Sequence, residues 1–546
     1  MKRLGIVIVF TLILSGFLAP PCRAAIYQSN GTAASVQSIL NNQAHNGDTI
    51  TLPAGILQWT ARVTISKAIT LQGAGVGTTV VRDGVQSGQL IQVTLAAGNL
   101  TRITGIEFQD GGRVNTQGAG GIVHVDGSNT NGSTFRFDHC KWNNLNGSAT
   151  FDTVIGVIDH NAFVIDRFSP PIYLYASHWN GQNNGDGSWA APTGFGSSQF
   201  LFIEDNNFTH SQQHQCSIVD AYGGARFVIR HNTIFNGLIS NHGTESTGRT
   251  RGGRAMEVYN NTFTGTNLNR FVGGVRSGGV LFHDNIVSGY WGNSATFALE
   301  NFRNFFPFDP WGGADGTNAW DVNSPTVFFT GTAAADSANK TVTVSGANWT
   351  PNQWAGYAIR RTSDACNSGS VSFSEILSNT SNTITYSDNG GYPTPPTMSF
   401  CAGDSFEIRK VVHALDQPGR ALGSLITGTP PVRPAGWNNQ VTEPCYSWNN
   451  TTGNAQVNFS TGPGVRANEH YFNNTAKPGY TSYVYPHPLA TGQATPPPSA
   501  TCSNLQQRLS QLQRRRQGLQ RRHRQNQRLN KKIRRLRQQL QVQHCV

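Results

Sequence analysis

Long apolar runs are absent from this sequence after residue 18, which excludes a membrane-spanning helix in the rest of the chain. Charged residues are scarce, at 13% of the 546 residues. Neither a CxxC motif nor a Cys/His cluster with zinc spacing is present, so the sequence predicts no structural metal.

The composition predicts a protein rich in β-structure. Glycine alone contributes 60 residues, and Asn and Thr are also frequent. Gly and Asn are turn residues and poor helix formers, which argues against a helical protein. An apolar fraction of 37% argues against a disordered one.

The first 24 residues have the layout of a secretory signal peptide. Lys2 and Arg3 precede an apolar run over 4–18, and small residues lead to Ala24. This run is short for a retained membrane helix, and we expect cleavage after Ala24. The sequence therefore predicts a secreted or cell-surface protein, which is an oxidising setting for its cysteines.

The net charge of +12 is concentrated at the end of the chain. Residues 501–546 hold 13 of the 41 Lys and Arg and no acidic residue. The signal segment holds three more, so the remaining 25 face 29 acidic residues. The body is slightly acidic and gives no reason to expect nucleic acid. The basic tail is expected to bind an anionic cell-surface component, and nucleic acid is a candidate ligand of the tail alone.

The tail, 502–546, follows a Pro-rich linker at 490–501 that we expect to be extended. Apolar residues in the tail recur mostly at steps of three, four and seven, as in a coiled coil. In one straight helix Cys502 and Cys545 would stand ~64 Å apart. A turn near 521–527 would bring them together, so the tail is predicted to be a helical hairpin closed by a disulfide, or else a coiled coil.

A short repeat of the form apolar, any, apolar, any, polar, Asn runs through the body. It occurs as FRFDHCKW at 135–142, with Cys140 in place of Asn, and with Asn as GVIDHNAF at 156–163, LFIEDNNF at 201–208, FVIRHNTI at 227–234, MEVYNNTF at 256–263 and VLFHDNIV at 280–287. Successive Asn residues from Asn206 to Asn285 are 26, 29 and 24 residues apart, the length of one coil of three short strands. The Asn positions are expected to form a buried hydrogen-bonded ladder.

This pattern resembles the right-handed parallel β-helix of pectate lyases, polygalacturonases and related carbohydrate-active proteins. GDTITLPAG at 47–55 and ITLQGAG at 69–75 are similar to the first coils of that family. The resemblance implies an all-β solenoid, a right-handed parallel β-helix, over 25–325 and again over 413–489. It also implies a polysaccharide as partner. Residues 33–43 have helical apolar spacing and are predicted to cap the open end.

Residues 326–412 lack the Asn repeat and have a different sequence pattern. They are predicted to form a small β-domain inserted into the solenoid. Alternating strands are expected at 340–346, 382–388 and 404–410. Cys366 and Cys401 are expected to form a disulfide within this segment.

Strand alternation converts the repeat into columns of outward side chains. One predicted column is Asp138, Asp159, Glu204, Arg230, Tyr259 and His283, and the next is Arg136, Val157, Phe202, Val228, Glu257 and Leu281. Adjacent coils are ~4.8 Å apart. Glu204, Arg230, Glu257 and Tyr259 are therefore expected to form one solvent-facing patch.

Loops rich in ionisable and aromatic residues are expected to lie near this patch. They span 168–199, 220–226 and 241–254. The predicted catalytic residues are Arg230, His242, Glu245 and Glu257. The predicted substrate-binding residues are Trp179, Trp189, Glu204, Asp220, Tyr222, Arg251, Arg254 and Tyr259.

Two mechanisms fit these residues. A lyase would use Arg to neutralise a uronate and Arg, His or Tyr as the base. A hydrolase would use two carboxylates that flank the bond. The excess of Arg favours an anionic polysaccharide and a lyase. The acidic calcium cluster of pectate lyases has no counterpart in the sequence. Calcium nevertheless stays open as a cofactor. The alternative is a non-catalytic adhesin or polysaccharide-binding surface protein.

Overall fold

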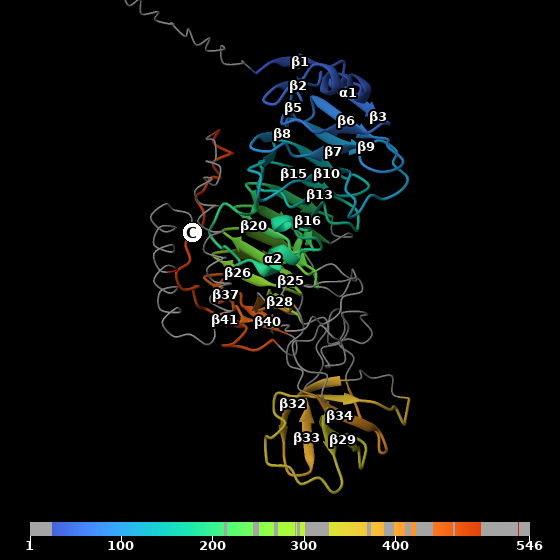
Figure 1. Cartoon of the computed structure of the whole chain (residues 1–546), viewed down its shortest axis with the longest axis vertical. Helices are drawn as coiled ribbons and strands as arrows, with labels where there is room; N and C mark the ends of the chain where they lie inside the picture. The colour runs from blue at the N-terminus through green and yellow to red at the C-terminus, as the bar shows by residue number, and fades with distance from the viewer. Residues whose placement is uncertain are drawn as a thin grey trace, which may run out of the picture.

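The computed structural model describes residues 24–211, 216–243, 251–266, 271–289, 291, 295–300, 327–367, 373–386, 398–409, 416–421, 441–461, 465–492 and 533. Predictions for the signal peptide, for Glu245, and for Cys502, Cys545 and the tail hairpin lie outside these residues. The described chain is mostly β-structure with long parallel sheets, which is consistent with a parallel β-helix (Figure 1).

Three long sheets form the solenoid, and the chain visits them in the same order on each full coil. In the described residues sheet A has twelve strands: β1 (Ile26–Gln28), β2 (Thr49–Thr51), β5 (Thr70–Gln72), β8 (Leu100–Thr104), β11 (Thr134–Asp138), β14 (Gly156–Asp159), β17 (Leu201–Glu204), β20 (Arg226–Arg230), β23 (Ala255–Tyr259), β26 (Gly279–His283), β37 (Cys445–Trp448) and β41 (Tyr471–Asn473).

Sheets B and C complete each coil. Sheet B comprises β3 (Gly55–Trp59), β6 (Thr79–Asp83), β9 (Glu107–Asp110), β12 (Lys141–Asn143), β15 (Ala162–Ile165), β18 (Asn207–His210), β21 (Thr233–Phe235), β24 (Thr262–Gly265), β27 (Ile286–Gly289), β38 (Thr451–Thr452) and β39 (Ala455–Gln456). Sheet C comprises β4 (Val63–Ile65), β7 (Ile91–Thr94), β10 (Val123–Asp126), β13 (Ala149–Asp152), β16 (Ile172–Tyr175), β19 (Ser217–Ala221), β22 (Leu238–Asn241), β25 (Gly273–Val275), β28 (Phe297–Leu299) and β40 (Phe459–Thr461).

Alternate residues of all three sheets point inward and fill one continuous apolar core. Its open N-terminal end is covered by α1 (Ala33–Asn42), which buries Val36, Ile39 and Leu40. Thr32 caps this helix, because its hydroxyl accepts a hydrogen bond from the Ser35 amide.

An asparagine ladder fixes the corner between sheets A and B. The side-chain amide of each Asn donates to the Oδ1 of the Asn one coil further on, at 2.8–3.1 Å, in the series Asn161, Asn206, Asn232, Asn261, Asn285 and Asn450. The residue before each ladder position has a left-handed φ, for example 56° at His231. The prediction of a structural ladder is confirmed, and it holds the columns in register.

Between β28 and β37 the chain forms a separate six-stranded antiparallel sheet, which lies at the lower end of Figure 1. Its order is β29 (Val327–Thr332), β34 (Ser405–Arg409), β31 (Ala358–Arg361), β32 (Phe373–Asn379), β33 (Thr383–Tyr386) and β30 (Thr341–Thr343). The sheet has its own apolar cluster around Trp349, Trp354 and Phe406. A short pair, β35 (Arg420–Ala421) and β36 (Val441–Thr442), precedes the return to sheet A.

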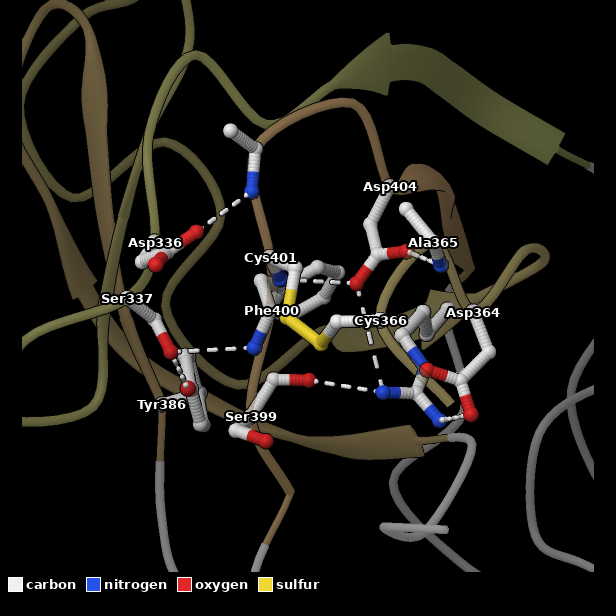
Figure 2. The surroundings of a disulfide bond; sticks show 12 residues. Asp336, Ser337, Asp364, Ala365, Cys366, Tyr386, Ser399, Phe400, Cys401 and Asp404 are labelled. Atoms are coloured by element: carbon white, nitrogen blue, oxygen red, sulfur yellow. Dashed lines mark hydrogen bonds and ion pairs between the residues drawn. A yellow bond between two sulfur atoms is a disulfide. The ribbon is translucent and has the colours of Figure 1, made fainter. Parts of the chain in front are cut away.

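A disulfide ties two loops of this sheet together. Cys366 and Cys401 are bonded, as predicted, and Figure 2 shows Asp404 beside them. The Asp404 carboxylate accepts hydrogen bonds from the Ala365 and Cys401 amides at 2.5 and 2.8 Å. One buried side chain therefore reinforces the same pair of loops that the disulfide joins.

After β41 the chain leaves the ladder of strands. Residues 479–489, named the strap here, form no strand and run back along sheet A, seen as the orange trace beside β26 and β20 in Figure 1. Strap residue Leu489 belongs to a second apolar cluster, on the outer face of sheet A, with Phe202 and Val228. The sequence pattern placed these residues in the coils of the solenoid, which is wrong for the part after β41.

Candidate functional site

The predicted columns of sheet A are present. Strand pairing aligns Asp138, Asp159, Glu204, Arg230, Tyr259 and His283 on successive coils. It also aligns Val228 with Glu257, so Glu204, Arg230, Glu257 and Tyr259 are neighbours as expected.

The expectation that this patch faces solvent is wrong. Glu204 and Arg230 have no exposed surface, and Glu257 and Tyr259 are 1% and 2% exposed. The strap covers them. Arg230 donates to the strap carbonyls of Tyr483 and Val484 at 2.7 and 2.9 Å.

The charged side chains of this patch form hydrogen bonds with other residues of the protein. Arg230 Nε donates to Glu204 Oε2 at 2.7 Å, and its Nη1 donates to the Tyr259 hydroxyl at 2.9 Å. The other Glu204 oxygen accepts the His487 amide at 2.7 Å. A buried ion pair with all of its hydrogen bonds made holds the strap on the sheet.

Glu257 is held in the same way. Its two oxygens accept the Gly196 amide at 2.8 Å and the Tyr480 hydroxyl at 2.5 Å. Burial raises the pKa of Glu257 to about 7. These contacts join the strap to the loop before β17, so Glu257 has a structural role in the described residues.

Asp138 and Asp159 are also buried rather than solvent-facing. The Asp138 carboxylate accepts from Arg102 at 2.5 and 2.7 Å, and Asp159 accepts from Arg136 at 2.7 and 2.9 Å. Hydrogen bonding to Arg102 offsets desolvation and lowers the Asp138 pKa.

The predicted aromatic platform is likewise buried. Trp189, in α2 (Asp186–Ala190), is 1% exposed and is flanked by the guanidinium groups of Arg251 and Arg254, each 5.2 Å from its ring. Trp179, in the short 3-10 turn Trp179–Gly181, is 5% exposed and packs against Arg226 at 4.7 Å.

Acidic residues from distant segments neutralise these arginines. Arg251 pairs with Asp416 at 2.5 Å and with Asp186 at 3.2 Å. Arg254 donates to Glu443 at 2.7 Å. Arg251 and Arg254, both predicted to bind substrate, therefore tie the loop before β23 to the segment that precedes β37.

The outer face of sheet C brings the remaining predicted residues together. Its strand pairing aligns one column of Gln92, His124, Thr150, Tyr173, Asp220, Ser240, Gly274 and Ala298, named the first column here. Pairing and backbone hydrogen bonds align a second column of Thr94, Asp126, Asp152, Tyr175, Tyr222, His242 and Arg276. Tyr173, Tyr175, His242 and Arg276 are partly exposed.

Asp220, Tyr222 and His242 form a close group on this face. The Tyr222 hydroxyl donates to Asp220 Oδ2 at 3.2 Å. His242 Nε2 lies 3.5 Å from Asp220 Oδ1, and the His242 ring stands edge-on to Tyr222 at 4.2 Å. Nδ1 of His242 has no hydrogen-bond partner among the described residues. This geometry suits an Nε2–H directed at the carboxylate, which leaves the buried Nδ1 as the unprotonated ring nitrogen.

The environment sets the protonation of this group. Burial, reinforced by the positive charge of Arg276, holds the pKa of His242 well below its ordinary value. Burial and the Asp220 carboxylate raise the pKa of Tyr222. At neutral pH the group therefore holds a neutral imidazole, able to accept a proton, beside a neutral phenol, able to donate one.

Stacked tyrosine rings lie next to this group on the neighbouring coil of sheet C. The Tyr222 ring stacks on Tyr175 at 5.6 Å and on Tyr173 at 6.1 Å. Burial raises the pKa of both Tyr173 and Tyr175. Sequence reasoning placed these two tyrosines in a loop at 168–199, whereas they alternate with Ile172 and Leu174 in β16. This alternation of apolar and tyrosine residues is the sequence pattern that indicates a strand here.

The described residues contain no group of three or more His, Cys, Asp or Glu side chains that could hold a metal ion. Asp126 and Asp152 are register partners on sheet C, and His124 lies 3.1 Å from Asp126. Calcium usually takes six to eight oxygen ligands, which this pair does not supply by itself. No helix in the described part of the chain is long and apolar enough to cross a bilayer.

Neither a protein-family model nor a curated protein matches the chain. Among solved structures, ORF18 of Geobacillus virus E2 is 14% identical, with a TM-score of 0.31, over 68% of this chain and 78% of its own. An alginate lyase from Paenibacillus sp. str. FPU-7 is 13% identical, with a TM-score of 0.23, over 50% of this chain and 93% of its own. Likenesses at these scores carry no argument about chemistry.

Proposed function

We propose that this chain binds an extended polysaccharide along the outer face of sheet C and cleaves it beside His242. The observation that carries the proposal is the second column, which places Tyr222, His242 and Arg276 on successive coils. A polymer lying along the column meets a new side chain about every 4.8 Å. Asp220 and Tyr222 are 7% and 9% exposed, and the partly exposed His242 beside them lies where several sugars can be held at once.

The residue set suits β-elimination of a uronate polymer. Arg276 neutralises the sugar carboxylate, and His242 takes the proton from the carbon next to it. A carbon–carbon double bond forms as the glycosidic C–O bond breaks, and the bonding pair leaves on oxygen. Tyr222 gives its hydroxyl proton to that oxygen and regains a proton from His242. Asp220 orients both groups through the contacts at 3.2 and 3.5 Å.

The proposed preference for an anionic polysaccharide is supported by Arg276 and not by the other arginines near the predicted site. Arg226, Arg230, Arg251 and Arg254 are buried, so a polymer on the surface does not reach them and they do not support it. Arg276 is partly exposed and acts electrostatically on His242. A uronate carboxylate beside Arg276 would bring the α-carbon proton toward the imidazole.

Incubation with acidic and neutral polysaccharides tests the proposal. Ultraviolet absorbance of unsaturated products together with new reducing ends is the expected result. Reducing ends without unsaturated products would indicate a hydrolase that uses carboxylates such as Asp152 and Asp220. Retention on a polysaccharide column without any product would leave only a binding or adhesin function and would contradict the cleavage proposal.

The organisation of the chain completes the proposal. We infer a right-handed solenoid exported by a signal peptide at 1–24, with an inserted β-domain at 326–412 and a basic hairpin at 502–546. The hairpin attaches the protein to an anionic surface, since 13 positive charges lie there without an acid. Retention of the whole protein on an anionic matrix should fall as salt rises, and removal of 502–546 should abolish it. Equal retention at low salt without the tail would contradict this role.

A further inference from the structure

Ala25, directly before strand β1, is held at both of its backbone polar atoms. Strand β1 is the edge strand of sheet A at the N-terminal end of the solenoid (Figure 1). The Ala25 carbonyl accepts a hydrogen bond from the Thr49 amide at 2.8 Å, and the Ala25 nitrogen donates to Asp48 Oδ1 at 2.7 Å. Ala24, which precedes it, is exposed. The two bonds therefore fix the position of the Ala25 nitrogen at the start of the fold.

Asp48 is a buried acid without a strong cationic partner in the described part of the chain. It is 6% exposed, and its Oδ2 accepts the His45 amide at 2.7 Å. Its one ion-pair contact among these residues is the His45 imidazole, which is 83% exposed and 3.8 Å away. Lys67 donates instead to the carbonyls of Leu40 and Ala44. Burying a carboxylate is costly unless an opposite charge accompanies it.

Removal of residues 1–24 would supply that charge. When a secretory signal peptidase hydrolyses the Ala24–Ala25 bond, the oxygen of water bonds to the Ala24 carbonyl carbon, and Ala25 is left with a free amine. The amine takes up a proton at neutral pH, since α-amino groups have an ordinary pKa of about 8. The nitrogen that donates to Asp48 as a neutral peptide N–H in the precursor is then an ammonium group in the same place.

We propose that Asp48 is the counter-ion of the α-ammonium group of the processed chain, and that cleavage after Ala24 thereby locks the first coil of the β-helix. This inference rests on the proposed signal peptide at 1–24 and not on the polysaccharide-binding face. Charge-assisted hydrogen bonds are roughly twice as strong as neutral ones. Because Asp48 directly precedes β2, the ion pair ties the start of β1 to the strand that it pairs with.

The lock has a defined pH dependence. A carboxylate beside an ammonium group raises the pKa of that group. The added stability is therefore fully present below about pH 8 and is lost as pH rises through the raised value. His45 is the other titratable group that contacts Asp48 among the described residues. It is present in the precursor and in the processed chain, so its contribution cancels when the two are compared.

The first measurement is the N-terminal sequence of the exported full-length chain, which should begin at Ala25. Any other first residue overturns the inference and leaves the polysaccharide proposal standing. Acylation of the Ala25 α-amine at pH 7, followed by mass spectrometry of the N-terminal peptide, then reports the ion pair. We expect acylation to be roughly tenfold slower than in Asp48→Asn, because a pKa raised by about one unit lowers the fraction of free amine tenfold. Equal rates overturn the ion pair.

Hydrogen exchange separates the charge of residue 48 from its shape. The Thr49 amide donates to Ala25 and the Ser29 amide to Thr51, so both report the opening of the first coil. A chain that begins at Ala25 should be compared with one that begins at Ala24, each with Asp48 and with Asp48→Asn.

Starting the chain at Ala24 should speed the exchange of these two amides roughly tenfold when residue 48 is Asp, the difference between a charge-assisted and a neutral hydrogen bond. The same extension should have no effect in Asp48→Asn, which controls for the loss of the His45 amide bond. An equal effect with both residues, no effect with either, or an effect with Asp48 that is unchanged at about pH 10 overturns the lock.

Discussion

The outer faces of sheets A and C carry similar columns of ionisable side chains, yet the two faces differ in what those side chains can do. On sheet A, the strap covers Glu204, Arg230, Glu257 and Tyr259 and completes their hydrogen bonds. On sheet C, Tyr175, His242 and Arg276 stay partly exposed. Strand register determines which residues are neighbours. A segment from a distant part of the chain determines whether those neighbours remain available to a ligand.

The largest expected effect is on the stability of the sheet A face. Arg230→Ala leaves Glu204 buried without its partner, which should lower the free energy of unfolding by about 3–5 kcal/mol. Denaturant unfolding measures this loss. The exposed Arg62 is the matched control, and Arg62→Ala should change stability by less than about 0.5 kcal/mol. If Arg230→Ala unfolds like its parent, the ion pair does not hold the strap.

The pH dependence of stability tests the burial of Glu257. Its pKa is raised to about 7 by desolvation, so the folded state favours the protonated carboxyl. The stability gained from protonation is fully present below about pH 4.5 and is lost as pH rises through 7. Over this range the parent should lose roughly 3 kcal/mol relative to Glu257→Gln.

Comparison with the Gln variant isolates this group. His487 on the strap has a pKa lowered to about 3 by burial, so its contribution is lost as pH falls and has the opposite sign. That contribution is common to both proteins and cancels in the difference. A difference that does not change between pH 4.5 and pH 8 would mean that Glu257 is not buried as described.

A smaller effect is expected from removing the six-stranded sheet. Replacing 326–412 by a short Gly/Ser linker keeps Asp416 and Glu443, which bind Arg251 and Arg254 at the corner of the solenoid. The parallel pairs β26–β37 and β28–β40 also remain. The rest should still melt cooperatively, as thermal unfolding followed by circular dichroism would show. An aggregated or unfolded product would show that the segment is part of the solenoid core.

Much of sheet A could be predicted from the sequence, because each of its strands from β14 to β37 is followed two residues later by an Asn of the ladder. The Asn residue marks a tight turn with a buried amide, and this local signal repeats from coil to coil. Sheet C has no comparable marker. The sequence predicts a loop where β16 lies, so it does not bring Tyr173 and Tyr175 beside Asp220 and His242.

The position of the strap over sheet A could not be predicted from the sequence, since it depends on contacts between residues more than 200 positions apart. Nothing local in the strap indicates that Tyr480 meets Glu257 or that Val484 meets Arg230. The same holds for the pairing of Arg251 with Asp416. Residue type alone made these arginines candidates for substrate binding, and only tertiary contact shows that their charges are already neutralised within the fold.

The most direct test of the account compares turnover in one variant of each face. His242→Ala should lower kcat by about 10²- to 10⁴-fold with little loss of stability, since it removes the proposed base from a partly exposed position. Glu257→Gln should leave kcat unchanged, because the Gln amide fills the same space: its oxygen can accept from the Gly196 amide while its NH2 group donates to the Tyr480 hydroxyl oxygen. Both are assayed on one acidic polysaccharide by the absorbance of unsaturated products. An active His242→Ala protein together with an inactive but folded Glu257→Gln protein would place the chemistry on sheet A and contradict the account.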